Sequence, residues 1–549
     1  MKFNKIITSF FSIAAASLLV AACGSNEQTA IDETGKVDSS QGLVFKIEAE
    51  EYQAAPAKSA TRTTGETIQP QEIDLGNGLV AELTIEPDTL QPEPQTRATI
   101  SDGHYRIYVL NSSGQRLTGP NQSIAGTVSG GVFTPDANKS MQLEHGTYTF
   151  VCINDAVTDL DSELLVEQGA INPMIGTTTV AITQPRQEIT FTMRHMMGRA
   201  RFQITSYTSV PINAKIGFNF YTPSKLYYDL DGSNSGAAFE TLSVQNIPFT
   251  PTVPVTYSPL VKTYKSVTDY LYFNFSTPLG GSGGDGSVQG TLYGKTFNIP
   301  KSSWQSYFSV QNNHSYLINF TIKSKTPLLL FNDGTVGYLG DKGTRTPIAL
   351  VYREKTKTQQ GIAMGLRGTV QEWEATTSPT YNGNNYTTAF ANSDDALQDE
   401  NGYNWTWTSS TDVDGLVKAN QQTRYPAFYW ASHDPYGVGF GEWYFPAIGE
   451  IINVFDKLAK KTNVSGSHVT FEKKLDVITN TFVSAGGTDP MNYRCWSSTI
   501  YTQPGFSSPI VFYSSGGGGG GYGYTIEVRP QGARKNNLSS IRTFPFVRF

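Results

Sequence analysis

A histidine and an aspartate side by side are the residues of this sequence best suited to acid–base chemistry. His433 and Asp434 lie between Trp430 and Tyr436 in the C-terminal third of the chain. An imidazole beside a carboxylate can exchange a proton near neutral pH. A hydrogen-bonded or surface pair explains adjacent loop residues more simply, and residues 326–549 contain no Gly-x-Ser-x-Gly or His-Glu-x-x-His motif. We therefore predict that the protein is not an enzyme.

Two cysteines in the body of the chain supply further reactive side chains. Cys152 lies in an apolar run, Cys495 precedes Trp496, and the two fall in different predicted domains. Neither cysteine has the spacing of a metal ligand, so the sequence predicts no metal site and no cofactor. We predict two buried free thiols, with a mutual disulfide as the alternative.

A third cysteine, Cys23, follows a segment with the pattern of an export signal. Lys2 and Lys5 give it a positive start, and an uncharged, mostly apolar run extends from residue 6 to residue 22. This run is short for a membrane span, which needs roughly 20 apolar residues. The small residues before Cys23 resemble the lipobox of bacterial lipoproteins, which implies cleavage before Cys23 and its acylation. Lipid on Cys23 would then anchor the chain in the outer membrane; a soluble secreted protein cut elsewhere is the alternative.

The composition favours an exported protein made of short strands. Charged residues make up 16% of the 549 residues and aromatic residues 12%, which is typical of strands joined by polar loops. A chain of this length exceeds one hydrophobic core and predicts about three domains. The formal net charge of −6 gives no reason to expect binding to nucleic acid.

Alternating apolar residues bounded by turn residues predict strands from residue 42 onward. Early strands at 43–47 and 79–85 are each followed by a stretch with one arginine, Arg62 and Arg97 respectively. A glycine-rich loop at 280–286 precedes neither a lysine nor a helix, so we interpret it as a hairpin tip. The other expected strands of two sandwich-like sets are 105–110, 146–153, 189–193, 200–204, 270–275 and 315–322.

These features, with motifs at residues 103–110, 143–148 and 193–200, resemble the fimbrillins, the lipoprotein pilins of Gram-negative anaerobes. The resemblance covers roughly residues 40–325 and implies two consecutive β-sandwich domains. It also implies that an Arg-specific protease removes the N-terminal strand, and that a strand of the next subunit fills the groove. Arg97 is the first candidate for this cut and Arg62 the second. Exposed, Pro-flanked loops explain both arginines equally well.

After residue 325 the pattern changes to strands mixed with helices. Apolar residues from Ile448 to Leu458 repeat at helical spacing, with Glu450 in the first turn, which predicts a helix starting near Pro446. A shorter helix is expected after residue 393. The expected strands are 328–331, 348–352, 361–366, 510–513 and 524–528.

Segments 442–450, 495–499 and 546–549 resemble, in order and spacing, a C-type-lectin-like domain of surface lipoproteins from the same bacteria. The resemblance covers roughly residues 326–549 and implies an α+β domain. The disulfides and the Ca²⁺- and sugar-binding motifs of animal C-type lectins are absent, so no Ca²⁺ site is predicted. The fold also hosts formylglycine-generating enzymes, whose cysteine chemistry only Cys495 could supply here. The acidic residues interpreted as a solvated loop are Asp394, Asp395, Asp399 and Glu400.

Aromatic side chains are the best candidates for ligand binding, because they stack on sugar faces and pack against protein partners. Trp405, Trp407 and Trp430 lie in turn-rich stretches that resemble the variable loops of this fold. Together with His433 and Asp434 they form the predicted ligand-binding set. A core role is the alternative, because alternation would place Trp405 and Trp407 on one face of a strand.

The two resemblances together predict the tip adhesin of a surface pilus. In fimbrillin stalks the C-terminal end supplies the donor strand, whereas a whole lectin-like domain occupies that end here. The predicted partners are other pilus subunits, through donor-strand exchange, and a glycan or protein receptor. The alternatives are a glycan-binding surface lipoprotein that does not polymerise and an enzyme on a C-type-lectin-like fold.

The sequence thus predicts a mainly β protein with three folded domains. Two consecutive fimbrillin-type β-sandwich domains are followed by an α+β C-type-lectin-like domain. The predicted divisions are a signal peptide (1–22), a lipidated tether (23–41), an N-terminal strand region that also forms a propeptide (42–97), the sandwich domains (98–205 and 206–325) and the lectin-like domain (326–549).

Overall fold

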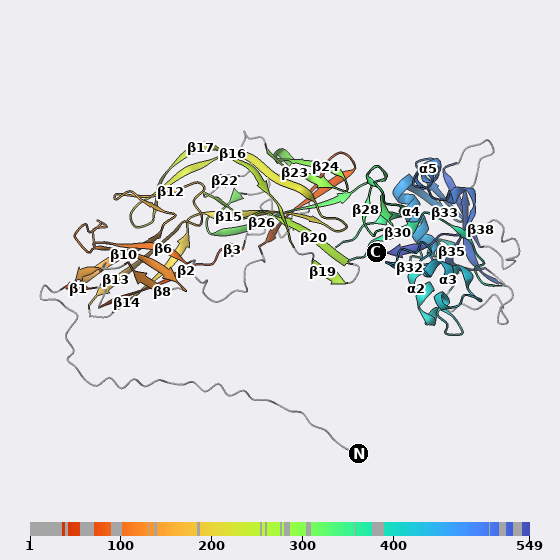
Figure 1. Cartoon of the computed structure of the whole chain (residues 1–549), viewed down its shortest axis with the longest axis horizontal. Helices are drawn as coiled ribbons and strands as arrows, with labels where there is room; N and C mark the ends of the chain where they lie inside the picture. Colours follow the sequence, from red (N-terminus) through yellow and green to blue (C-terminus); the bar gives the residue numbers. More distant parts are fainter. Residues whose placement is uncertain are drawn as a thin grey trace, which may run out of the picture.

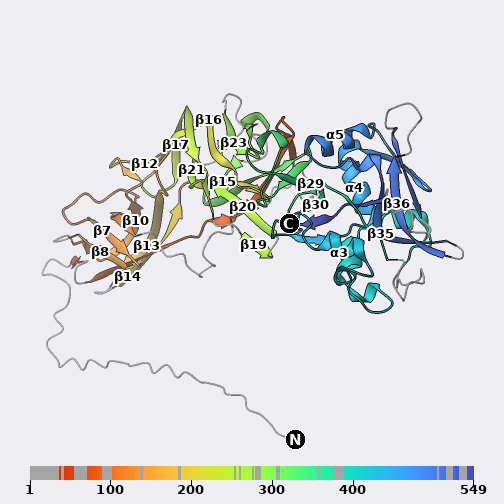
Figure 2. The same ribbon diagram turned by 45° about the vertical axis from the view of Figure 1, so that its right-hand side comes forward.

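The structure is a computed structural model in which the chain forms an elongated molecule (Figure 1). Strands fill one end and the middle, and the α-helices gather with the C-terminal strands at the other end, as the turned view also shows (Figure 2). The described residues are 36–38, 42–54, 71–88, 102–130, 132–136, 140–183, 187–252, 255–258, 261–274, 277–278, 286–303, 309–356, 358–375, 389–503, 506–514, 523–530 and 541–549.

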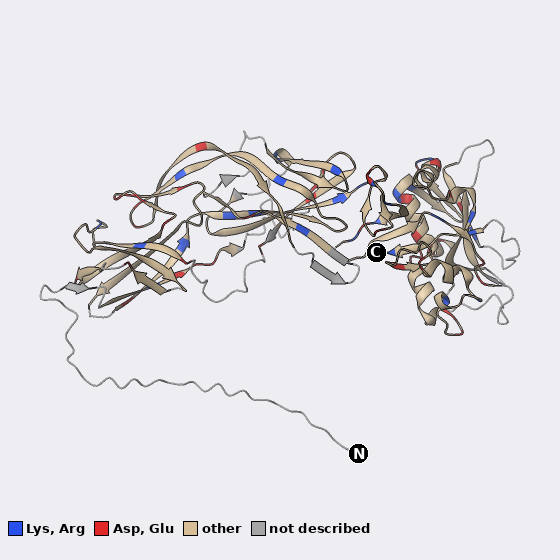
Figure 3. Cartoon of the chain, in the orientation of Figure 1, with Lys and Arg blue, Asp and Glu red and all other residues tan. Residues whose placement is uncertain are grey.

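Most described elements are β-strands, which confirms the mainly β fold predicted from the sequence. Within the described ranges, every α-helix lies after residue 392. Lys, Arg, Asp and Glu are interspersed along the ribbon (Figure 3). In this part of the chain, no helix has both the length and the apolar character needed to cross a bilayer.

The first unit is a closed barrel. In β2 the burial alternates, so Leu43, Phe45 and Ile47 face the core while Val44 is 58% exposed. The rings of Phe45 and Phe133 meet edge to face, with centroids 5.9 Å apart. Strand β2 runs parallel to β14. The barrel strands, in sheet order, are β10 (Gly146–Asn154), β13 (Met174–Ile182), β14 (Gln187–His195), β2 (Leu43–Ala49), β8 (Val132–Pro135), β7 (Ser123–Ser129) and β6 (Gly103–Leu110).

The second unit consists of two sheets that share an apolar core, in which the rings of Phe202 and Phe218 lie 5.8 Å apart. One sheet contains β11 (Thr158–Asp159), β12 (Leu164–Glu167), β16 (Ile212–Tyr228), β23 (Gly286–Leu292) and β24 (Lys295–Pro300), with β17 (Asn234–Pro248) paired to β16. The other contains β18 (Thr250–Pro251), β20 (Val261–Val267), β15 (Gly198–Ser206), β26 (His314–Ser324), β5 (Leu79–Pro87) and β4 (Gln71–Asp74), with β3 (Gln53–Ala54), β19 (Val255–Ser258) and β21 (Leu271–Phe273) attached.

The segment before residue 89 contributes strands to both units. Strand β2 belongs to the barrel, whereas β3, β4 and β5 belong to the second unit. Strand β5 lies between β26 and β4, and its Leu79, Ala81 and Leu83 are buried in the core. The strand predicted at 79–85 is therefore an internal strand of the second unit. Two short pairs complete the part of the chain before residue 325: β1 (Lys36–Asp38) with β9 (Gln142–Glu144), and β22 (Thr277–Pro278) with β25 (Ser309–Val310).

The C-terminal unit combines two sheets with the α-helices. One sheet contains β28 (Val336–Gly337), β27 (Leu328–Phe331), β29 (Pro347–Arg353), β30 (Ile362–Gly365), β39 (Phe546–Arg548) and β32 (Glu442–Tyr444). The other contains β31 (Thr369–Val370), β38 (Ile541–Thr543), β35 (Arg494–Gln503), β36 (Phe506–Ser514), β37 (Thr525–Pro530), β34 (His468–Phe471) and β33 (Lys461–Ser465). The helices are α1 (Ser393–Leu397), α2 (Gly402–Trp407), α3 (Pro426–Ser432), α4 (Ile448–Ala459) and α5 (Asp476–Ser484).

The two helices predicted in this unit are confirmed as α1 and α4. In α4 the buried apolar residues recur every three or four positions, which gives the helix one face toward the core. Its first turn is stabilised by Glu450, whose Oε2 accepts the Ala447 N–H at 2.8 Å. The buried residues of this face include Ile448, Ile451, Ile452, Phe455 and Leu458.

One apolar core continues across residue 325 from the second unit into the C-terminal unit. Leu330 on β27 and Val547 on β39 belong to the same buried cluster as Phe218 on β16. Beside this cluster the Tyr293 hydroxyl donates to Glu354 Oε1 at 2.6 Å. The second and C-terminal units are therefore joined by packing and not by a free linker.

Leu79→Ala on β5 should destabilise the protein, because this side chain is 0% exposed. Truncating a buried leucine costs about 2–5 kcal/mol through lost transfer energy and the cavity left behind. Val44→Ala removes methyl groups from an exposed position of β2 and should change stability by less than about 0.5 kcal/mol. Urea unfolding compares the two variants, and equal effects would contradict the burial of β5.

Candidate functional site

Three of the predicted site residues, Cys23, Arg62 and Arg97, lie outside the described residues. Arg62 belongs to the stretch between β3 and β4, and Arg97 to the stretch between β5 and β6. Lipidation and proteolytic processing at these positions stay predictions. The structure contributes the strand pairing on either side of the two arginines.

Strand β26 is the element whose surroundings depend most on the chain before Arg97. It pairs in parallel with β15 along one edge. Along its other edge it pairs with β5, from Tyr316 opposite Pro87 to Ser324 opposite Leu79. Buried backbone N–H and C=O groups need partners, so β26 depends on a strand in the position of β5.

A buried carboxylate fastens the end of β5 to the second unit. Asp88, which is 7% exposed, directly follows β5. It accepts hydrogen bonds from the guanidinium of Arg201 and from the hydroxyl of Tyr270. The Ser315 hydroxyl donates to Asp88 Oδ2 at 3.0 Å. These three donors come from β15, from the residue before β21 and from β26.

A second set of contacts fastens the chain just before β3. The Tyr52 ring stacks on the His195 imidazole, with centroids 3.8 Å apart, and lies 4.1 Å from the Arg199 guanidinium. The Tyr52 hydroxyl donates to Asn172 Oδ1 at 2.9 Å. Burial lowers the pKa of His195 to about 4, so its ring is neutral at pH 7. The Nε2 atom of this ring lies 2.8 Å from the Glu50 carbonyl oxygen.

Trp405 and Trp407 lie on helix α2 and not on a strand, so the strand predicted from their alternation is wrong. Thr406 Oγ1 donates back to the Gly402 carbonyl at 2.8 Å, which suits a helical turn better than a strand. Trp405 packs against one buried cluster and Trp407 against another. Their indole N–H groups donate inside the unit, from Trp405 to Asp399 Oδ2 at 2.8 Å and from Trp407 to the Trp443 carbonyl at 2.9 Å.

The other three predicted binding residues lie at and after helix α3. Trp430 is half-buried against the same cluster as Trp405. The His433 ring stacks on the Tyr429 ring, with centroids 4.0 Å apart, and its centroid lies 6.4 Å from that of the Trp407 ring. The structure therefore brings Trp407 beside His433, and it brings Trp405 and Trp430 to one cluster.

His433 and Asp434 have different hydrogen-bond partners. His433 Nδ1 lies 2.9 Å from the Tyr429 carbonyl oxygen, and Asp434 Oδ2 accepts the Gly439 N–H at 2.7 Å. Asp434 has a positive φ of 42°, which turns the chain at the end of α3. Both residues thus hold the local backbone, which matches the loop-pair alternative weighed from the sequence.

Two acidic residues at the centre of the C-terminal unit, Asp399 and Glu450, are buried, which the sequence did not predict. Asp399 is 3% exposed and accepts the Thr499 hydroxyl at 2.7 Å, so its assignment to a solvated loop is wrong. Glu450 accepts the Tyr444 hydroxyl at 2.6 Å. Burial raises the pKa of Glu450 to about 8, and the nearby Asp399 acts in the same direction. The space is closed at Gly402, where a Cβ would lie 2.3 Å from Glu450 Oε2.

The described residues contain no group of three His, Cys, Asp or Glu side chains placed to hold a metal ion. Cys152 and Cys495 are both buried free thiols, which confirms that prediction. Burial raises the pKa of both thiols well above the usual range, which keeps them protonated and poorly nucleophilic.

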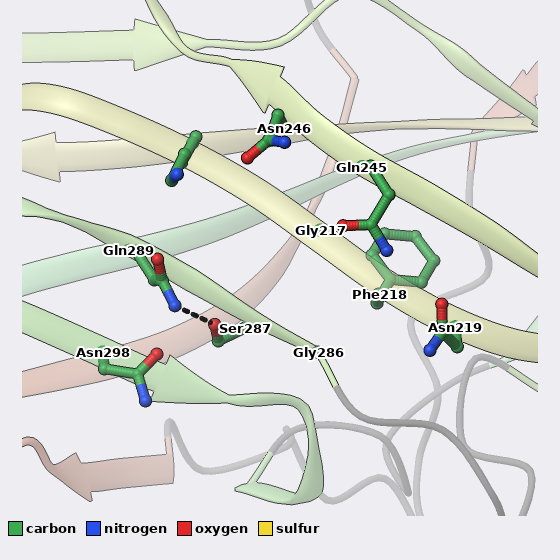
Figure 4. A pocket seen from close by; sticks show the side chains of 10 residues that line it. Gly217, Phe218, Asn219, Gln245, Asn246, Gly286, Ser287, Gln289 and Asn298 are labelled. Carbon is green, nitrogen blue, oxygen red and sulfur yellow. Dashed lines mark hydrogen bonds between the residues drawn. The ribbon is translucent and has the colours of Figure 1, made fainter.

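A hollow of about 360 Å³ lies on the outer face of the sheet formed by β16, β17, β23 and β24 (Figure 4). Gly217 and Gly286 leave its floor without side chains. Gln245, Gln289 and Asn298 surround it, and Gln289 Nε2 donates to Ser287 Oγ at 2.9 Å. Planar amides can both donate and accept hydrogen bonds, as recognition of sugar hydroxyls requires. Sequence periodicity gave no signal for this hollow, because it depends on side chains from four strands.

An aromatic pair lies further along β16 and β17. Tyr221 and Phe239 are 56% and 54% exposed, and their rings stack with centroids 5.7 Å apart. Tyr221 is two residues from Asn219, which lines the hollow, so both side chains belong to the same face of β16. This sheet face therefore offers amides and exposed aromatic surface together.

No protein-family model and no curated protein matches the sequence. Solved structures of fimbrial proteins do match. A fimbrial protein from Bacteroides ovatus has 11% identity and a TM-score of 0.25, and the match covers 93% of this chain and 99% of that one. A fimbrial assembly protein from Parabacteroides distasonis has 10% identity and a TM-score of 0.25, with 41% and 88% covered.

Glu450→Gln should flatten the pH dependence of stability. The folded-state pKa of about 8 lies above the ordinary value of 4.5, so the folded protein holds this proton more tightly than the unfolded chain. The resulting stabilisation is complete below about pH 4.5 and is lost as the pH rises through about 8.

Urea midpoints measured between about pH 5 and about pH 8 test this expectation. The wild type should lose stability relative to Glu450→Gln as the pH rises. Glu442→Gln, at an exposed carboxylate of the same unit, should keep the wild-type slope. Parallel curves for the wild type and Glu450→Gln would contradict the buried, protonated state.

Proposed function

We propose that this protein is a surface pilus subunit that assembles by donor-strand exchange after Arg-specific proteolysis. The observation that supports this most directly is the position of β5. It is an internal strand of the second unit, yet it lies before Arg97 in the chain. Cutting after Arg97 would detach β5 from the covalent body and leave the edge of β26 for a strand of another subunit.

The strand pairing favours Arg97 over Arg62 as the processing site. Cleavage after Arg62 would separate β1, β2 and β3 and keep β4 and β5 in the chain. Cleavage after Arg97 would separate all five described strands from β1 to β5 and open both the barrel beside β14 and the second unit beside β26. Only the second cut creates a groove lined by the partners of Leu79, Ala81 and Leu83.

We propose a tip position because the strand that would serve as donor is enclosed in its own sheet. Strand β39 pairs with β30 on one side and with β32 on the other. Phe546 and Val547 on this strand are both 0% exposed. The lectin-like unit would then point outward and contact a glycan or protein receptor, with Trp407, Trp430 and His433 as candidate contacts.

The proposal includes export and anchoring. Lipid on Cys23 would hold the precursor in the outer membrane, and cleavage after Arg97 would transfer the body of the protein to the fimbrium. We propose a binding role and not an enzymatic one, because the buried thiols and the separately bonded His433 and Asp434 supply no reactive group.

N-terminal sequencing of the surface-exposed protein tests the processing step. The mature wild-type chain should begin at Ala98, and Arg97→Ala should keep β5 and fail to enter pili. Arg62→Ala is the matched control and should process normally. A lipidated start at Cys23 that is unchanged by removal of the Arg-specific protease would overturn the pilus assignment.

A second candidate function, glycan capture without polymerisation, is favoured by the amide-lined hollow of Figure 4. A glycan array followed by titration of the hits tests it. Gln289→Ala should weaken binding at least about tenfold, because a buried sugar hydroxyl would lose its partner. Thr127→Ala, at an exposed position of the barrel strand β7, should leave binding unchanged. Equal binding by the two variants would exclude the hollow as the site.

A further inference from the structure

The end of the groove that β5 fills is lined by groups that bind a carboxylate. Arg201, Tyr270 and Ser315 each donate a hydrogen bond to Asp88. All three donors follow residue 97, so they remain with the protein when the N-terminal segment leaves. We infer that they form a carboxylate-binding site, and that a strand replacing β5 must bring a carboxylate to it. This inference rests on the proposed donor-strand exchange.

The charge of Arg201 makes an empty site costly. Its side chain is 10% exposed, and Asp88 is the carboxylate with which it forms an ion pair among the described residues. A second cation lies close by, because the Arg199 guanidinium packs 4.0 Å from the Tyr270 ring. Loss of Asp88 would leave a buried positive charge without its partner, which is far less favourable than an unpaired charge in water.

The direction of β5 defines where the incoming carboxylate must lie. Strand β5 is antiparallel to β26, and Asp88 follows its C-terminal end. A strand inserted in the same direction would present apolar residues at the positions of Leu79 and Leu83 and a small residue at Ala81. Its carboxylate would come nine positions after the residue that takes the place of Leu79, either from an Asp or Glu side chain or from a free C-terminus.

The same strand carries a matched control carboxylate. Glu82 also pairs with a cation, since its Oε2 lies 2.5 Å from Lys323 Nζ. The two side chains are 31% and 41% exposed, so this pair is half in water. Exposed ion pairs contribute little to binding, and loss of the Glu82 charge should matter much less than loss of the Asp88 charge.

Binding of synthetic β5 peptides to the full chain cut by an Arg-specific protease tests the inference. The probes are amidated peptides of residues 79–88: the native sequence, Asp88→Asn and Glu82→Gln. Asp88→Asn should weaken binding at least about 30-fold, as expected for a buried charge pair that loses one partner. Glu82→Gln should weaken it less than about fivefold. A fourth peptide, Asp88→Asn with a free C-terminal carboxylate, separates the two sources of the carboxylate.

Measuring the same peptides on the Arg201→Met protein completes a double-mutant cycle between Arg201 and Asp88. Ser315→Ala provides a milder protein variant if Arg201→Met does not fold. In either protein the difference between the native and Asp88→Asn peptides should shrink. Binding of the native and Asp88→Asn peptides with equal affinity to the cut wild-type chain would overturn the carboxylate site and leave strand exchange standing. Failure of all peptides to bind the cut chain would overturn the proposed exchange together with this inference.

Discussion

Strand β26 is paired along both of its edges, and the pairing with β5 is the constraint around which the second unit is built. A strand in a buried sheet cannot leave its N–H and C=O groups without partners, and the residues beside them cannot face water without losing apolar burial. Strand β5 meets both needs, since it completes the backbone ladder and fills the core with Leu79, Ala81 and Leu83. The second unit thus depends on a strand that comes from far before it in the chain.

The attachments of the N-terminal segment are concentrated where the barrel meets the second unit. Tyr52 lies against His195 and Arg199, and Asp88 lies against Arg201. The ring of His195 is neutral because burial lowers its pKa to about 4. Aromatic stacking, one buried ion pair and a long backbone ladder act together there, so a covalent cut alone does not weaken these contacts.

Sequence periodicity predicted strands with one buried and one exposed face, such as β2 with Leu43, Phe45 and Ile47 inward and β14. Short continuous apolar runs predicted strands that are buried almost throughout, such as β26 and β27. It failed where tertiary context decided the outcome. The alternation of Trp405 and Trp407 indicated a strand, but Thr406 bonds back along a helical turn and the two rings pack into different clusters. The sequence predicted Asp399 as a solvated loop residue, but its buried hydrogen-bond partner is Thr499, which is distant in the sequence.

The glycine-rich loop shows the same limit of local patterns. A loop between two strand-like segments suggests a hairpin, but the predicted hairpin tip at 280–286 is wrong. Strand β23 already pairs with β16 on one edge and with β24 on the other, so it has no edge for β22. Strand β22 pairs with β25 instead. Most of the loop itself lies outside the described residues. The pairing of strand edges depends on the whole sheet, so the sequence of a single segment does not predict which edges are already occupied.

The apolar core that continues across residue 325 has a consequence for how such proteins diversify. Trp443, Val547 and Phe549 of the C-terminal unit are buried in one cluster with Phe218 of the second unit. Recombination that joined this C-terminal unit to a different N-terminal part would inherit half of a core, exposed as an apolar surface. Variants of the C-terminal unit should therefore arise by substitution in surface loops, or by exchange of the second and C-terminal units together as one inherited block.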